Sequence, residues 1–108
     1  MSTVRSIDAP TLKAWLENDE AILVDVRDVE EYKDVHIPGA ILMPLSVFRV
    51  ESAPLNPDKK LVFHCKAGKR GDSACMKSAE HAHQRIVYNL EGGIGAWIEA
   101  GYPTKAAQ

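Results

Sequence analysis

Short apolar runs alternate with helix-like segments along this chain. The runs 22–24, 40–42, 61–63 and 86–88 are nearly continuous and partly β-branched, which is typical of strands covered on both faces. Strands that alternate with helices over about 100 residues indicate a mainly parallel sheet. We therefore predict an α/β fold with helices on both faces of the sheet, in which ligands bind beyond the carboxyl ends of the strands.

The expected helices are marked by apolar positions at helical spacing. Asp8 is the expected N-cap of the first helix, with Pro10 in its first turn, and Gly101 ends the last helix with Pro103 beyond it. The first expected helix is marked by Leu12, Trp15 and Leu16, and the last by Ile94, Trp97 and Ile98, which are expected to be buried. Three further helices are expected between them, at 29–34, 45–50 and 72 to about 83.

Composition limits the chain to one domain and few kinds of partner. The 108 residues carry a formal net charge of −2, so we expect neither nucleic acid nor a membrane as a partner. No apolar run approaches the roughly 20 residues that span a bilayer, and the first residues do not resemble a signal peptide. We expect a cytoplasmic single domain over 1–108, with its core at about 8–103 and a frayed tail at 104–108.

A cysteine follows the third apolar run and opens a short basic loop before the segment expected as a helix from residue 72. From residue 59 to residue 70 there are five bases and no acid. Amide N–H groups, a helix N-terminus and cations all stabilise a thiolate, so this cysteine is a candidate nucleophile rather than a packing residue. The same donors would hold an anionic substrate. The loop reads Cys65, Lys66, Ala67, Gly68, Lys69 and Arg70.

Several polar residues near this loop leave more than one interpretation open. Asp25 and Arg27 could contact substrate, but a strand-end ion pair that orients the loops is favoured. Arg70 could likewise turn inward to Asp25 and brace the loop. Cys75 is expected to pack within its helix without a disulfide to Cys65, a resolving role being the weaker alternative.

Metal chemistry is not expected. His81 and His83 lie two positions apart, which does not place them on one helix face, and the two cysteines fit no zinc spacing. We predict neither a metal site nor a cofactor.

Three blocks, in this order along the chain, resemble rhodanese-like domains. The first is LVDVR at 23–27 with EY at 31–32 and HIPGA at 36–40, and the second is CKAGKR at 65–70. The third is LEGGIGAW at 90–97 with GYP at 101–103. The resemblance as a whole runs from about Asp8 to Pro103, nearly the whole chain. Each block alone is a weak signal, whereas the ordered set is specific.

The resemblance implies a sheet of about five strands and a sulfurtransferase activity. In such domains the loop cysteine attacks the outer sulfur of a donor such as thiosulfate and becomes a persulfide, whose sulfur passes to cyanide or a thiol. Cys65 would be the nucleophile, and the partners a small anionic sulfur donor and a thiol acceptor. The implied substrate-binding residues, which supply amides and positive charge, are Lys66, Ala67, Gly68, Lys69, Arg70 and Gly71.

Two other functions remain as alternatives. A slow carrier of a persulfide or nitrosothiol, or a redox sensor, would also need a reactive cysteine. A small phosphatase or arsenate reductase is disfavoured, because in protein phosphatases the loop arginine falls six positions after the cysteine and Arg70 falls five after Cys65. His64 precedes the cysteine as in those phosphatases, but we interpret it as a strand-end residue rather than a general base.

Overall fold

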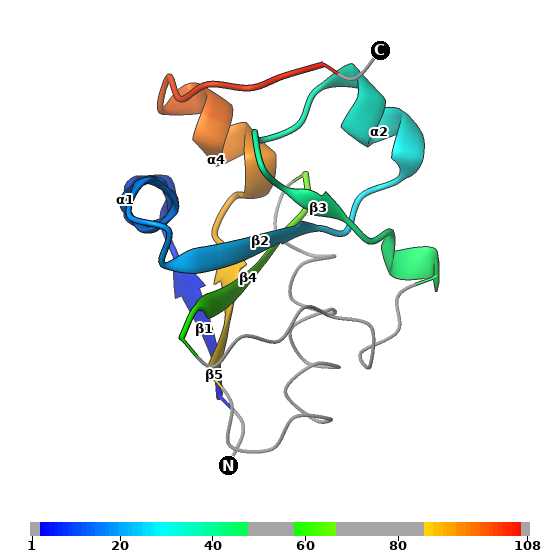
Figure 1. Cartoon of the computed structure of the whole chain (residues 1–108). Coiled ribbons are helices and arrows are strands. Elements are labelled where there is room, and N and C mark those ends of the chain that lie inside the picture. The colour runs from blue at the N-terminus through cyan, green and yellow to red at the C-terminus, as the bar shows by residue number, and fades with distance from the viewer. Residues whose placement is uncertain (1–2, 48–57, 67–85, 107–108) are drawn as a thin grey trace.

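The structure is a computed structural model, and it describes residues 3–47, 58–66 and 86–106. Within these ranges, helices alternate with parallel strands (Figure 1). The strands are β1 (Thr3–Ile7), β2 (Ala21–Asp25), β3 (Ile41–Leu42), β4 (Lys60–His64) and β5 (Ile86–Leu90). The helices are α1 (Ala9–Glu17), α2 (Val29–Asp34), the 3-10 turn η1 (Leu45–Val47) and α4 (Gly93–Glu99).

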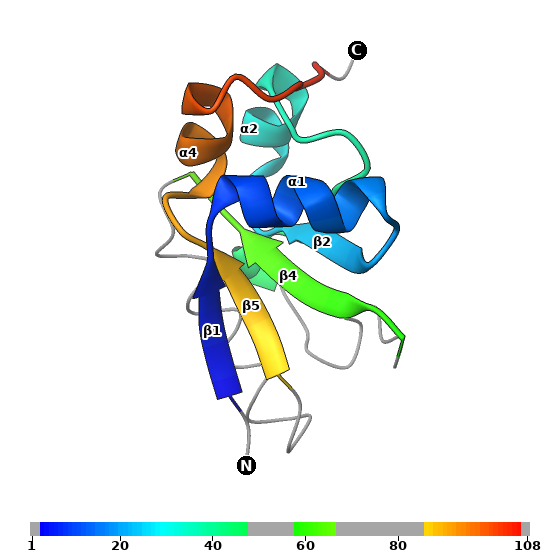
Figure 2. The ribbon, with the colours of Figure 1, turned by 90° about the vertical axis from the view of Figure 1, so that its left-hand side faces the viewer.

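The five strands form one sheet in the order β1-β5-β4-β2-β3, and every pairing is parallel. This confirms the predicted α/β class. Strand β4 is central, and its register with β2 sets Asp25 beside His64 at the carboxyl ends of both strands. Figure 2 shows β1, β5 and β4 side by side, with α1 crossing the sheet.

Both faces of the sheet carry buried apolar side chains, as the near-continuous apolar runs predict. On one face, Leu23, Val62 and Leu90 pack with Leu12 of α1 and Trp97 of α4. The opposite face carries a second buried cluster, consisting of Val24, Val26, Leu61, Phe63, Cys65 and Val87. Because side chains alternate along a strand, Leu61, Phe63 and Cys65 share this second face.

Helices α1 and α2 each begin directly after an aspartate that acts as the N-cap. Asp8 is the N-cap of α1 and its carboxylate accepts a hydrogen bond from the Thr11 amide at 2.9 Å. Asp28 is the N-cap of α2, where its own amide donates to Glu31 at 3.1 Å. These contacts confirm both predicted starts and satisfy amides that have no partner inside the helix.

Several sequence predictions need correction. Ile86, which opens the run 86–88 expected to be buried, is 39% exposed on β5. Strand β1 was not anticipated, and it lies at the edge of the sheet, where Val4 and its neighbours are exposed. The run 40–42 is not a buried strand, since Ile41 is 43% exposed on edge strand β3. Ile98 is 48% exposed, so only Ile94 and Trp97 anchor α4. Residues 45–47 form a 3-10 turn, while 48–50 and the helix expected at 72–83 lie outside the described residues.

As far as Lys105, the C-terminal segment is hydrogen-bonded to the rest of the domain and is not frayed, which corrects the predicted tail. His36 and Lys105 form an antiparallel bridge with two backbone hydrogen bonds of 2.8 Å. The Trp97 indole N–H also donates to the Pro103 carbonyl at 2.8 Å. None of the helices in the described ranges is long and apolar enough to cross a membrane.

Candidate active site

Cys65 follows β4 directly, at the edge where the carboxyl ends of the parallel strands meet. Its side chain is only 1% exposed and packs beside Phe63 and Leu61. Lys66, the next residue, is exposed. The remaining predicted cradle residues, Ala67, Gly68, Lys69, Arg70 and Gly71, lie outside the described residues, as does Cys75. Of the predicted site, the structure thus places Cys65 and Lys66.

The first turn of α4 holds the backbone of these two residues. The Ile94 amide donates to the Cys65 carbonyl at 2.8 Å, and the Gly95 amide donates to the Lys66 carbonyl at 3.3 Å. Amides in the first turn of a helix have no partner within it, so they are available for such contacts. The start of the loop is therefore fixed by a segment about 30 positions further along the chain.

Gly93 makes this close approach possible. Its φ is +59°, and a Cβ at this position would lie 2.3 Å from the Cys65 carbonyl oxygen and 2.6 Å from the Lys66 carbonyl carbon. Any other residue would have a strained backbone at this φ, and its Cβ would clash with backbone atoms that cannot move as a flexible side chain could. The resemblance includes this glycine, but the sequence alone gave it no role.

We expect Gly93→Ala to lower the free energy of unfolding by about 2–4 kcal/mol, because it adds strain at positive φ to a backbone clash. Urea denaturation would measure the loss. Gly101→Ala is the matched control, since its φ is +82° but nothing lies within 4 Å of the added Cβ. Equal losses of unfolding free energy in the two variants would show that the close contact with Cys65 and Lys66 does not contribute to the effect of Gly93→Ala.

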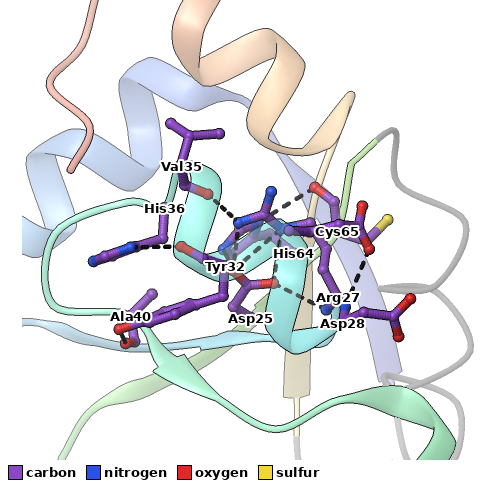
Figure 3. A network of polar contacts seen from close by, with 10 residues as sticks. Asp25, Arg27, Asp28, Tyr32, Val35, His36, Ala40, His64 and Cys65 are labelled. Carbon is purple, nitrogen blue, oxygen red and sulfur yellow. Dashed lines mark hydrogen bonds and ion pairs between the residues drawn. The ribbon is translucent and has the colours of Figure 1, made fainter. Parts of the chain in front are cut away.

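Asp25 and Arg27 form a buried ion pair beside the loop (Figure 3). Arg27 donates from Nε to both carboxylate oxygens at 3.0 and 3.2 Å, and from Nη2 to Oδ2 at 2.7 Å. Nη2 also donates to the Val35 carbonyl at 2.6 Å, at the end of α2. The two side chains are 0% and 3% exposed. These contacts support the interpretation of Asp25 and Arg27 as a strand-end ion pair, because the pair links the end of β2 to the end of α2 by hydrogen bonds.

His64 lies between this ion pair and the backbone of Cys65. Its Nδ1 is 3.3 Å from the Cys65 carbonyl oxygen. Its Nε2 is 3.6 Å from Asp25 Oδ2 and has no hydrogen-bond partner among the residues that the structure describes. The ring is fully buried. Burial lowers the pKa of His64 below its ordinary value, and this outweighs the opposing influence of the Asp25 carboxylate. His64 is the last residue of β4, as the sequence predicted, and its burial disfavours the charged ring.

The lowered pKa of His64 predicts a stability that depends on pH. The unfolded chain binds a proton at this side chain near pH 6.5, whereas the folded chain binds it only at a lower pH, so the free energy of unfolding falls as the pH drops from 6.5 toward the lowered pKa of the folded state. The slope approaches about 1.4 kcal/mol per pH unit for one proton. Urea denaturation of the wild type and His64→Gln at several pH values would measure it. Parallel curves for the two proteins would contradict the prediction.

A cavity of about 240 Å³ adjoins the loop on the side of α2 and α4. Its charged lining comes from Arg27, Lys66, Glu31 and Asp34, and its apolar lining includes Ile94 and Ile98. A small molecule therefore has room beside the residue that follows Cys65. No cluster of potential metal ligands occurs among the residues that the structure describes.

A cysteine at the carboxyl end of the central strand places this chain among parallel α/β proteins whose sites lie at that edge. Residues 8–100 match the rhodanese-like domain family. A protein named sulfurtransferase from Allochromatium vinosum is 30% identical over 106 residues, which cover 97% of this chain and 98% of that protein. The chain therefore belongs to the rhodanese-like family.

Other relatives extend this result. The putative sulfur carrier protein YrkF of Bacillus subtilis is 27% identical over 89% of this chain, which spans 52% of that longer protein. The crystal structure of thiosulfate sulfurtransferase from Pseudomonas aeruginosa matches with a TM-score of 0.84 and 26% identity, covering 97% of this chain and 21% of that one. These similarities confirm the predicted fold and assign the chain to the sulfurtransferases in general.

Proposed function

We propose that this protein moves a sulfane sulfur from thiosulfate or a similar anionic donor to a thiophilic acceptor through a persulfide on Cys65. One observation carries the proposal: Cys65 directly follows the central strand β4, and its carbonyl and that of Lys66 both accept hydrogen bonds from amides of α4. A fixed nucleophile beside a cation is what attack on an anion requires. The similarity to a thiosulfate sulfurtransferase supports the choice of donor.

The reaction has two displacements. In the first, the Cys65 thiolate attacks the outer sulfur of thiosulfate, the S–S bond of the donor breaks, and sulfite leaves with the electron pair. In the second, cyanide or a thiolate attacks the outer sulfur of the persulfide, and Cys65 leaves as a thiolate. Lys66 and the amides and cations from Ala67 to Gly71 are the groups proposed to stabilise the negative charge in both steps.

Intact mass spectrometry tests this function. We expect the reduced protein to gain one sulfur atom on incubation with thiosulfate and to lose it on addition of cyanide. Digestion and peptide mass analysis would then locate the sulfur on the peptide with Cys65 rather than on that with Cys75. No gain in mass would overturn thiosulfate as the donor, and a gain on Cys75 would overturn the assigned nucleophile.

The exposed charge of Lys66 is expected to favour an anionic donor. Lys66→Ala should raise KM for thiosulfate by about three- to fivefold, the effect of one partly screened charge, and change KM for an uncharged sulfur donor much less. Steady-state kinetics with both donors would show the difference. Lys59→Ala is the control, because it removes a lysine paired with Asp19 just before β4, at the other end of that strand from Cys65. Equal changes for both donors would remove the electrostatic role.

A sulfur carrier of low turnover is a second candidate. The 1% exposure of Cys65 favours it, because a buried sulfur discharges slowly unless a partner opens or fits the site. The similarity to a putative sulfur carrier protein agrees with this function. Stoichiometric loading by thiosulfate followed by slow release to cyanide would favour a carrier, whereas rapid multiple turnovers would favour the enzyme.

A further inference from the structure

The cavity between α2 and α4 has no part in the proposed sulfur transfer beyond Lys66 in its lining. It measures about 240 Å³, and its charged lining residues are of both signs. Pockets for drug-sized ligands occupy about 300–1,000 Å³, so this cavity fits a smaller molecule. Figures 1 and 2 both show α2 and α4 at the same end of the molecule. A ligand held there would contact two helices that are far apart in the sequence.

One part of the lining is positively charged. The Lys66 side chain is exposed and forms no hydrogen bond or ion pair within the described part of the chain. The Arg27 side chain is 3% exposed, and its contacts with Asp25 and Val35 use Nε and Nη2. A guanidinium has further N–H donors on Nη1, and these remain available to a ligand in the cavity that Arg27 lines. A carboxylate in the cavity would therefore find two cationic donors.

A second part of the lining is negatively charged. Glu31 and Asp34 lie three positions apart on α2, and therefore on one face of that helix. Glu31 also accepts a hydrogen bond from the Asp28 amide. The Asp34 side chain is exposed and has no hydrogen bond or ion pair to any residue in the described ranges. Because Lys66 and Asp34 line one cavity without pairing with each other, a molecule between them can pair with both.

The cavity also has an apolar part, which comes from α4. Ile94 and Ile98 lie four positions apart, and therefore on one face of this helix. Ile94 is 3% exposed, whereas Ile98 is 48% exposed. An apolar group in the cavity would cover part of Ile98 and remove that surface from water, which favours binding.

We propose that this cavity binds a single amino acid whose side chain is apolar. The ligand's carboxylate accepts hydrogen bonds from Lys66 and from Nη1 of Arg27. Its ammonium group pairs with Asp34, and its side chain lies on Ile94 and Ile98. Binding requires neither the thiol of the nucleophile nor a sulfur donor. One consequence rests on the proposed function: a carboxylate on Lys66 would compete with the anionic sulfur donor for this charge.

An NMR titration of the whole chain with L-leucine tests the site, because chemical shifts report weak binding residue by residue. We expect saturable shifts at Gly95 and Ile98, which line the cavity, and none at Val4 on β1. Two analogues each lack one charge: 4-methylpentanoate has no ammonium group, and 3-methylbutylamine has no carboxylate. Each should bind about three- to fivefold more weakly, the effect of one partly screened charge pair. No saturable shift with leucine, or equal affinity for leucine and either analogue, would overturn the proposal.

Two variants test which group of the ligand pairs with which charge. Asp34→Asn should weaken leucine binding about three- to fivefold without weakening that of 4-methylpentanoate, and Lys66→Ala should weaken both. Asp19→Asn, which removes an exposed carboxylate paired with Lys59 before β2, is the control and should weaken neither. Weaker binding of both compounds to Asp34→Asn would contradict the position of the ammonium group. Thiosulfate is absent from these titrations, so their failure and a failure of sulfur transfer are separate results.

Discussion

Cys65→Ser is expected to lower the rate of sulfur transfer by at least about a thousandfold, because the hydroxyl is not ionised near neutral pH and cannot form a persulfide. The thiosulfate:cyanide assay would measure the loss. The substitution also buries a hydroxyl among Leu61, Phe63 and their apolar neighbours, at a cost of about 1–3 kcal/mol. Cys65→Ala avoids this cost, and its activity should be equally low.

Cys75→Ser is the matched control for the nucleophile, since it removes the only other cysteine of the chain. We expect it to retain sulfur transfer. Persistent activity in both Cys65 variants, with circular dichroism showing that they are folded, would contradict the assignment of Cys65. Loss of activity in Cys75→Ser alone would transfer the catalytic role to the second cysteine.

Asp25→Ala is expected to lower the free energy of unfolding by about 3–5 kcal/mol, because it leaves the Arg27 guanidinium buried without its carboxylate. The variant also removes the acceptor of the Arg27 backbone amide, a contact of 2.9 Å. Urea denaturation followed by circular dichroism would measure the change. A loss below about 1 kcal/mol would show that Arg27 finds water or another acceptor.

Two further variants separate burial from charge. Glu17→Ala removes an exposed ion pair with Lys13, of 3.2 Å, and should cost no more than about 0.5 kcal/mol. The double variant Asp25→Ala with Arg27→Met should lose less than the sum of the single losses, since no buried charge is then unpaired. Additive losses would contradict a direct interaction between the two side chains.

The sequence predicted the buried part of the sheet well, because strands that are covered on both faces need apolar residues at successive positions. Strand β1 has no such run, since its side chains are largely exposed at the edge and its pairing with β5 depends on backbone hydrogen bonds. The exposed Ile41 and Ile98 show the reverse error. An apolar side chain alone does not reveal whether another element covers it.

The candidate site was only partly predictable for a similar reason. Cys65 and Lys66 could be found because a cysteine within a basic loop is a local pattern. The contacts of Gly93 and Gly95 with that loop join residues almost 30 positions apart, and no local pattern encodes them. The burial of His64 is also a tertiary property, which depends on the register that pairs it with Asp25.

The bridge between His36 and Lys105 has a practical consequence for experiments with attached groups. It holds the end of the described chain beside α2, the helix that lines the cavity next to Lys66, whereas β1 begins at the opposite end of the sheet (Figure 1). An affinity tag or fluorophore joined after residue 106 would therefore lie close to the region where donor and acceptor must approach. Surface immobilisation or labelling through the N-terminal side should leave that approach open.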